Sequence, residues 1–203
     1  MKKYKINNPR GKRLMSKITV FNYVTVDGFF AGPNGEIDWF KKIQYDDEWN
    51  EYSHDASESE SRTIMFGHTT YEMMKSFWPT TEAIKMDPGM AKVMNHSPKI
   101  VFSKTLKSVK EETNWKNIKV LNEINREEII EIKSKYNVII LGSGSIVQQF
   151  SNLELIDEYL LAVIPIVLGS GIPMFKGVKE MSLTLAEVKC FNNGIVLHHY
   201  KTK

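Results

Sequence analysis

Hydrophobic and polar positions divide the chain into short apolar runs and longer amphipathic stretches. Runs rich in β-branched and aromatic residues predict strands. They lie at residues 17–24, 62–66, 99–103, 118–121, 137–141, 157–164, 183–191 and 195–200. Spacings of three and four between apolar residues predict helices at 46–61, 68–76, from 125 onward, and 145 to about 150. The glycine- and proline-rich segments 25–38 and 77–98 are expected to be loops.

Local signals refine this pattern. Asp46 and Asn125 are each placed to cap the helix that follows, and Glu128 completes the spacing of a capping box. The sequence Asn-Asn-Gly at 192–194 predicts a hairpin between the last two strands. Residues 137–141 (NVIIL) are apolar on both faces, as expected of a strand that is covered on both sides.

The order of these elements predicts the fold class. Strands that alternate with helices and end in a hairpin predict an α/β protein with three layers, α/β/α. Its central sheet is expected to be mostly parallel, with an antiparallel C-terminal hairpin. Ligands of such sheets bind beyond the carboxyl ends of the strands. That edge should carry Gly67, Ser103 and Gly142, each of which follows a predicted strand.

Composition limits the class of protein. The 203 residues include 27 basic and 24 acidic ones, but six of the basic residues lie within the first 14 positions. We expect residues 1–15 to be a disordered leader or tag remnant, with an RNA-binding arm as the alternative, and residues 16–203 to form a single domain. The single cysteine, Cys190, favours a reducing, cytoplasmic location. No apolar run reaches the roughly 18 residues of a membrane helix, and the histidines show no metal-binding spacing, so neither a membrane nor a metal is expected.

The turn at 142–144 (Gly-Ser-Gly) is the most informative segment. It joins a buried strand to a helix, so its backbone N–H groups and the helix dipole can receive a phosphate. Ser143 and Ser145 can add hydroxyl donors. The turn lacks the third glycine of a dinucleotide fingerprint and the lysine of a Walker A loop. A purely structural strand-to-helix turn is therefore an equal alternative.

Four segments together resemble the dihydrofolate reductase fold, and more closely the reductase domain of the bacterial riboflavin-pathway deaminase-reductase. They are VTVDGFFAGPNG (24–35), MFGHTTYEMM (65–74), IVFSKTL (100–106), and IILGSGSIVQQF with IDEYLLAVIPIVLGSGIPMF (139–150 and 156–175). The resemblance covers residues 17–200. It implies a dihydrofolate reductase-like domain that binds NADPH and transfers a hydride.

The resemblance also implies where the cofactor binds. Gly67, Thr69 and Thr70 would lie against the diphosphate and adenosine half, and Ser103 and Lys104 beside the adenosine ribose, with Lys104 a partner for a 2′-phosphate. The turn residues Gly142, Ser143, Gly144, Ser145, Ile146 and Val147 would cradle the pyrophosphate. Ala31 would lie near the nicotinamide, and Gly169 in a turn beneath the cofactor. His68 replaces the family's arginine, so the preference for NADPH over NADH is an expectation.

The remaining candidates concern the substrate. Asp38 and Asp47 are candidate proton sources, although both positions also suit a loop end and a helix N-terminus. Asp27 is a candidate for substrate contact or, alternatively, for shaping its own turn.

Large apolar side chains complete the set. Trp39 and Trp78 are candidates for walling a planar substrate, or for ordinary core packing. Phe175 is a candidate for closing the same pocket.

These observations predict an NADPH-dependent reductase of a small heteroaromatic, pterin-like or carbonyl compound. The alternative is a non-catalytic nucleotide-binding sensor or partner-binding module. No nucleic-acid partner is expected, and the apolar terminal strands favour a homodimer.

Overall fold

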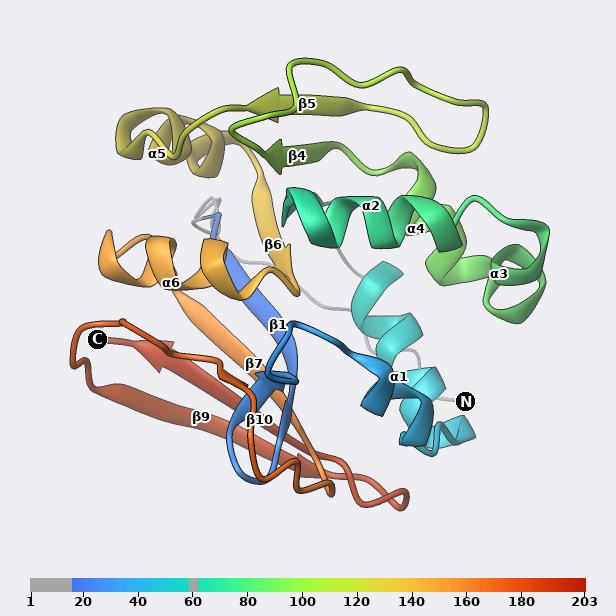
Figure 1. Ribbon diagram of the computed structural model, residues 1–203, viewed down its shortest axis with the longest axis vertical. Helices are drawn as coiled ribbons and strands as arrows, with labels where there is room; N and C mark the ends of the chain where they lie inside the picture. The colour runs from blue at the N-terminus through green and yellow to red at the C-terminus, as the bar shows by residue number, and fades with distance from the viewer. Residues whose placement is uncertain (1–15, 59–61) are drawn as a thin grey trace, which may run out of the picture.

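A long mixed sheet forms the centre of the structure (Figure 1), a computed structural model that describes residues 16–58 and 62–203. Its strands, in the order in which they pair, are β5 (Ile118–Leu121), β4 (Lys99–Phe102), β3 (Arg62–Gly67), β6 (Asn137–Leu141), β1 (Ile18–Thr25), β7 (Glu158–Ile164), β10 (Val196–Thr202) and β9 (Leu183–Cys190). The first six strands pair in parallel. Strand β10 pairs antiparallel with β7 on one side and with β9 on the other. The prediction of a mostly parallel sheet with an antiparallel C-terminal hairpin is confirmed.

The helices of the described residues are the 3-10 helix η1 (Asp38–Lys42) and the α-helices α1 (Asp47–Glu58), α2 (His68–Phe77), α3 (Thr81–Met86), α4 (Pro88–His96), α5 (Arg126–Lys135) and α6 (Gly144–Asn152). Helices α1, α2, α5 and α6 begin within one residue of the predicted starts, whereas η1, α3 and α4 were not predicted. Asp46 caps α1 through a 2.8 Å bond from the backbone N–H of Trp49, and Asn125 caps α5. The Glu128 carboxylate accepts a bond from Lys119 Nζ at 2.7 Å.

Two expected loops contain regular structure. Residues 77–98 hold α3 and α4, and Pro88 occupies the first turn of α4 behind the capping residue Asp87. Proline fits there because the N–H it lacks would have no partner within the helix. Within 25–38, β2 (Phe29–Ala31) pairs with β8 (Ile172–Pro173) in a second, small sheet. The expectation for residues 1–15 falls outside the described residues.

The helices cover both faces of the sheet, which gives the three predicted layers. Figure 1 shows α5 and α6 to the left of the sheet and α1 to α4 to the right. On the right-hand face the core has two parts. One, the α1 cluster, packs Trp39, Trp49 and neighbouring side chains against β7 and β10. The other, the α2–α4 cluster, packs Tyr71, Met94 and their neighbours against β3 and β4.

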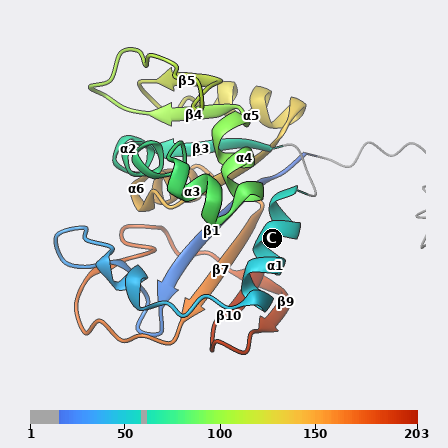
Figure 2. The ribbon, with the colours of Figure 1, turned by 90° about the vertical axis from the view of Figure 1, so that its right-hand side faces the viewer.

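The sheet is left partly open between these two clusters. β1 and β6 pair only up to Phe21 and Leu141, after which β1 continues along β7 to Thr25 while β6 ends. Figure 2 shows α2 to α4 over one half of this face and α1 beside the other, with β1 and β7 in view between them. The carboxyl edge of the sheet therefore opens at its middle, where ligands of α/β folds bind.

Candidate functional site

A cavity of about 1130 Å³ lies between the α1 cluster and the α2–α4 cluster. Its lining comes from β1, β3, β6, α1, α2, α4, the glycine turn and the segment around β2. The volume exceeds the roughly 300–1,000 Å³ of ordinary small-molecule pockets. It has room for two ligands in contact, as a reaction between a cofactor and a substrate requires.

Two helices begin at the rim of this cavity. α2 follows Gly67 and α6 follows Ser143, and neither has a side-chain cap or an acidic residue in its first turn. The first N–H groups of a helix have no partner within it, and the aligned peptide dipoles place partial positive charge there. Thr69 and Ser145, in these first turns, are exposed and line the cavity. The two helix ends together suit an anion with more than one phosphate.

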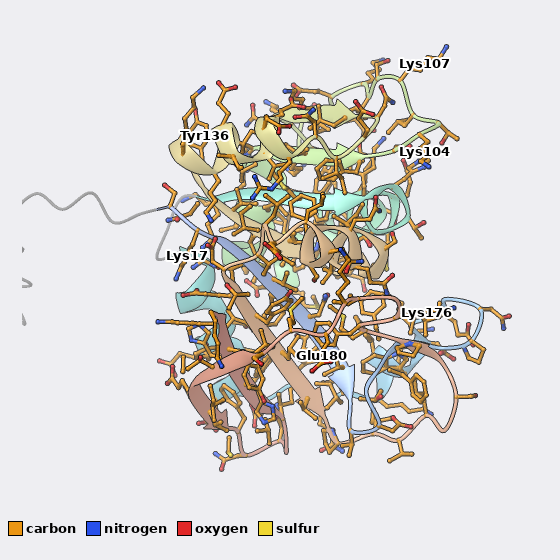
Figure 3. All side chains as sticks on the ribbon, turned by 90° about the vertical axis from the view of Figure 1, so that its left-hand side faces the viewer. Lys17, Lys104, Lys107, Tyr136, Lys176 and Glu180 are labelled. Atoms are coloured by element: carbon orange, nitrogen blue, oxygen red, sulfur yellow. The ribbon has the colours of Figure 1, made fainter. Side chains whose placement is uncertain are left out.

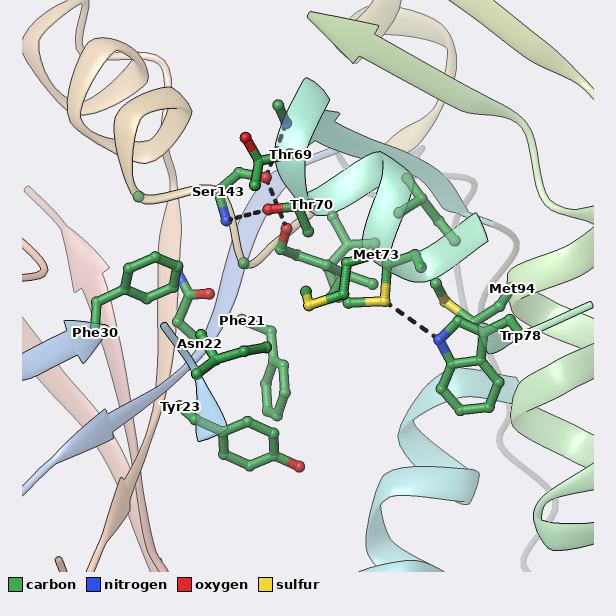
Figure 4. A pocket seen from close by; sticks show the side chains of 18 of the residues that line it. Phe21, Asn22, Tyr23, Phe30, Thr69, Thr70, Met73, Trp78, Met94 and Ser143 are labelled. Atoms are coloured by element: carbon green, nitrogen blue, oxygen red, sulfur yellow. Dashed lines mark hydrogen bonds between the residues drawn. The ribbon is translucent and has the colours of Figure 1, made fainter. Parts of the chain in front are cut away.

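Ser143 joins the two helix ends directly. Its Oγ accepts a bond from the backbone N–H of Gly67 at 2.8 Å and donates one to the carbonyl of Leu141 at 3.2 Å. Its backbone N–H donates to Thr70 Oγ1 at 3.2 Å, as Figure 4 shows. Ser143 is buried and has a left-handed backbone, with φ of 57°. Its hydroxyl is thus engaged within the protein and not free for a phosphate as expected, whereas the exposed Ser145 hydroxyl remains a candidate donor.

The glycines of the turn are also required by the protein's own packing. A Cβ at Gly142, which has φ of 59°, would lie 3.0 Å from Thr70 Cγ2. A Cβ at Gly144 would lie 3.1 Å from the ring of Phe30. These contacts support the alternative that the turn is purely structural. A substitution at either glycine would disturb the packing of the protein as well as any ligand, so it cannot test ligand binding alone.

The other cofactor candidates lie around this centre. Ala31 lines the cavity, while Ile146 and Val147 are buried in the core behind the turn. Ser103 and Lys104 follow β4 outside the lining; the Ser103 hydroxyl accepts N–H groups of its own turn. In Figure 3 the Lys104 side chain lies at the edge where the strands end, as does Lys176. Lys17 and Tyr136, which precede strands, lie at the opposite edge.

Asp27 joins two loops of the protein. Its carboxylate accepts bonds from Thr25 Oγ1 at 2.6 Å, from Gly169 N at 2.7 Å and from Leu168 N at 3.1 Å. The Thr25 hydroxyl and these amides hold the pKa of Asp27 below its ordinary value of 3.8. Asp27 and Gly169 do not line the cavity, and the bond between them joins their two loops.

The two candidate proton sources and two of the three candidate wall residues lie outside the lining. Asp38 and Asp47 are exposed at the starts of η1 and α1. Trp39 is 1% exposed within the α1 cluster, and Phe175 packs edge-on against Tyr159. Trp78 does line the cavity, and its indole N–H donates to Met74 Sδ at 3.3 Å (Figure 4).

An aromatic wall opposite α2 escaped the sequence analysis. Its members are Phe21 and Tyr23 of β1, Phe30 of β2, Phe40 of η1, and Trp49 and Tyr52 of α1. Phe21 stacks on Trp49 with their ring centroids 6.5 Å apart, and Tyr23 packs on Phe40. In Figure 4 Met73 of α2 lies across the cavity from this wall. The alternation of residues 21 to 24 was a usable signal, because it places the rings of 21 and 23 on one face of a strand.

The ionisable groups in the lining are phenolic or basic. Within the described residues, no Asp or Glu lines the cavity, whereas five basic residues do: Arg62, His68, Lys92, His96 and Lys176. Burial and the nearby Tyr45 raise the pKa of the Tyr23 hydroxyl, so it stays protonated at neutral pH and can donate. His68 Nε2 lies 3.5 Å from Glu72 Oε1.

Neither a metal centre nor a membrane-spanning helix is present in the part of the chain that the structure describes. No group of three or more His, Cys, Asp or Glu is arranged to hold a metal ion in residues 16–58 and 62–203. Over the same ranges, no helix combines the length and apolar character that crossing a membrane requires.

The sequence matches a known family over most of its length. Residues 16–197 match the RibD C-terminal domain. The chain is 30% identical over 188 residues to the uncharacterized protein YwjB of Bacillus subtilis (strain 168), covering 91% of this chain and 98% of that protein. It is 27% identical over 194 residues to the uncharacterized protein YyaP of the same organism, covering 94% and 95%.

Solved structures share the fold. A protein of Shewanella sp. PV-4 named for riboflavin biosynthesis superposes with a TM-score of 0.71 at 22% identity, covering 92% of this chain and 99% of that one. A deaminase and 5-amino-6-(5-phosphoribosylamino)uracil reductase of Thermotoga maritima superposes with a TM-score of 0.63 at 13% identity. This chain is covered to 93% in that comparison, and the Thermotoga chain to 57%. These likenesses confirm the dihydrofolate reductase-like fold.

Proposed function

The chain belongs to the RibD C-terminal domain family, and on that premise we propose that it is an NADPH-dependent reductase of a small heteroaromatic, pterin-like or carbonyl compound. The observation that supports this most is the meeting of two uncapped helix N-termini at the rim of one large cavity. NADPH, when bound, supplies the hydride. The residues of this chain bind and orient the two ligands.

The residues present fit the diphosphate of such a cofactor. The first turns of α2 and α6 contain no carboxylate to repel it, and their outward N–H groups have no partner within the helices. The bonds of Ser143 to Gly67 and Thr70 fix the spacing of the two helix ends before a ligand arrives. Preorganisation of this kind lowers the entropy that binding costs.

The adenosine half has a route outward along the strand edge. Lys104 is exposed there and can attract a 2′-phosphate as a point charge. On this proposal, Lys104→Ala should weaken NADPH binding more than NADH binding. Equal losses for the two cofactors would remove Lys104 from the proposed site.

The substrate would occupy the groove between the aromatic wall and α2. Stacked rings and methionines favour a flat, largely apolar ligand. Water would be displaced from this space when both ligands are present, which strengthens the remaining electrostatic contacts.

A negative charge at the helix end tests the proposal. Ser145→Glu places a carboxylate in the first turn of α6, where the helix dipole favours it, so the fold should keep or gain stability. The same carboxylate would repel a diphosphate, and we expect the NADPH dissociation constant to rise at least tenfold. Ser145→Gln is the matched neutral control. NADPH fluorescence on mixing measures binding; no binding to the wild type at millimolar cofactor would overturn the proposal.

One observation favours a second candidate, a nucleotide-binding module that does not catalyse. The described part of the cavity lining has no Asp or Glu, and therefore offers no carboxylic acid to protonate a reduced substrate. Cofactor binding without NADPH oxidation across a panel of carbonyl, pterin and flat heteroaromatic compounds would favour this candidate.

A further inference from the structure

Asn22 is a buried amide that lines the cavity. It lies on β1 between Phe21 and Tyr23 and is only 2% exposed. The one hydrogen bond of its side chain within the described residues runs from Nδ2 to the thioether sulfur of Met174, at 3.5 Å. Sulfur of this kind is a weak acceptor. The amide oxygen has no partner, so Asn22 uses little of its hydrogen-bonding capacity.

The amide oxygen of Asn22 is not among the fully buried polar atoms that lack a partner, so it is accessible from the cavity. Phe30, beside it in Figure 4, offers no donor or acceptor, and the amide of Gln148, which also lines the cavity, donates to the carbonyl of Met174 at 3.3 Å. A ligand in the cavity can therefore complete the hydrogen bonds of Asn22. Exchanging the amide oxygen and nitrogen, which have the same shape, would leave the same deficit.

The position of Asn22 indicates which ligand this is. Phe21 pairs with Leu141, the last residue of β6, so Asn22 lies beside the start of the glycine turn. The ring of Phe30, drawn next to Asn22 in Figure 4, covers Gly144. Asn22 is therefore next to the proposed diphosphate site, on its inner side. The exposed edge with Lys104 lies on the outer side.

We propose that the Asn22 side chain anchors the carboxamide of the cofactor's nicotinamide. A dinucleotide with its diphosphate on α2 and α6 and its adenosine toward Lys104 directs its other end inward, toward Asn22. The nicotinamide carboxamide carries one acceptor and two donors and can pair with the like groups of Asn22. The pairing would fix the face that the ring presents to the groove. This inference rests on the proposed function.

Ligands that differ only at the nicotinamide end test it. In Asn22→Leu, which keeps a similar volume, the dissociation constant of NADPH should rise about threefold to tenfold, the effect of one hydrogen bond. ADP-ribose carrying a 2′-phosphate has no nicotinamide, so its affinity should stay within twofold. The reduced 3-acetylpyridine analogue of NADPH lacks the amide donors, and its affinity should change less than that of NADPH.

Each contrary outcome is distinct. Unchanged NADPH affinity in Asn22→Leu overturns the inference and leaves Asn22 to the substrate or to packing. Equal losses for NADPH and the nicotinamide-free ligand overturn it too, because they indicate a general disturbance of the site. Failure of both ligands to bind the wild type overturns the proposed function itself. Asn114→Leu, the same change at an exposed asparagine outside the cavity lining, is the control and should leave the affinities for both ligands unchanged.

Discussion

Ser143 Oγ and the backbone N–H of Gly67 are joined by a 2.8 Å hydrogen bond across 76 residues of sequence. This bond links the starts of α6 and α2, the two helix ends at which we propose that the cofactor binds. Ser143 also has a left-handed backbone, which costs a residue with a Cβ about 1 kcal/mol. The protein thus keeps a strained serine at a position where glycine would be easier, and the hydroxyl explains why.

Two substitutions separate these effects. Ser143→Ala removes the hydroxyl but keeps the strain, and the Gly67 N–H loses its partner. We expect a loss of about 1–3 kcal/mol in the free energy of unfolding. Ser143→Gly removes both and should lose about 1 kcal/mol less. Urea denaturation measures both values. If Ser143→Gly is less stable than Ser143→Ala, the backbone of residue 143 is not strained.

Asp27 should make the folding stability depend on pH in the acidic range. Its pKa is lower in the folded protein than the ordinary 3.8, so its stabilising contribution is present above that value and disappears as the pH falls through the folded pKa. Asp27→Asn should be less stable than the wild type at pH 7, and the difference should shrink below pH 4. Thermal unfolding between pH 7 and pH 2.5 tests this. A difference that stays constant with pH would show that the charge is not the cause.

Lys99 is 1% exposed, and its ammonium donates to the carbonyls of Asn95, Ser97 and Lys116. Lys99→Met leaves these carbonyls without their donor, and we expect a loss of about 2–4 kcal/mol at pH 7. Burial lowers the pKa of Lys99 from 10.5 to about 8. The folded state therefore releases this proton first, and the wild type should gain stability relative to Lys99→Met as the pH rises above 8.

Denaturation of both proteins at pH 7, 8 and 9.5 provides the measurement. Lys116→Met is a suitable control, because the side chain of that residue is exposed. If the difference in stability between the wild type and Lys99→Met shrinks as the pH rises, burial does not lower the pKa of Lys99.

The free edge of β9 is where we propose that two copies pair. Among the described residues β9 pairs only with β10, and Leu185 and Val188 on it are 54% and 46% exposed. An unpaired strand edge with exposed apolar residues is a template for another strand. Leu185→Lys should convert a dimer to a monomer in light scattering at micromolar concentration. Val167→Lys, at an exposed apolar residue outside β9, should not; a monomeric wild type would remove the proposal.

The strands were predictable because their signal is local. Residues 137–141 are apolar on both faces, and the structure places them between β3 and β1 in the middle of the sheet. Helix α4 was missed because Pro88 and Gly89 were interpreted as breakers. Pro88 behind Asp87 is equally a signal for a helix start, and only the packing of Met94 against β3 and β4 decides between them.

The sequence could predict the candidate site only where its residues are consecutive in the chain. The glycine turn and its helix form one segment, so the residues alone indicated a candidate phosphate site there. The aromatic wall was not predictable, because Phe21, Phe30 and Trp49 belong to three elements and each alone resembles a core residue. Asn22 was missed for a related reason: only the positions of its neighbours reveal that its amide oxygen accepts no hydrogen bond from the described residues.

The groove has a consequence for how the molecule opens. The α1 cluster depends on β7 and β10, and the α2–α4 cluster on β3 and β4, with the sheet and the contact of α1 with α4 joining them. Each cluster can thus serve as a separate cooperative unit, and amide hydrogen exchange would report two opening free energies. A molecule that fills the groove touches both units. Its arrival would merge them into one, so that the fastest-exchanging half becomes as slow as the other.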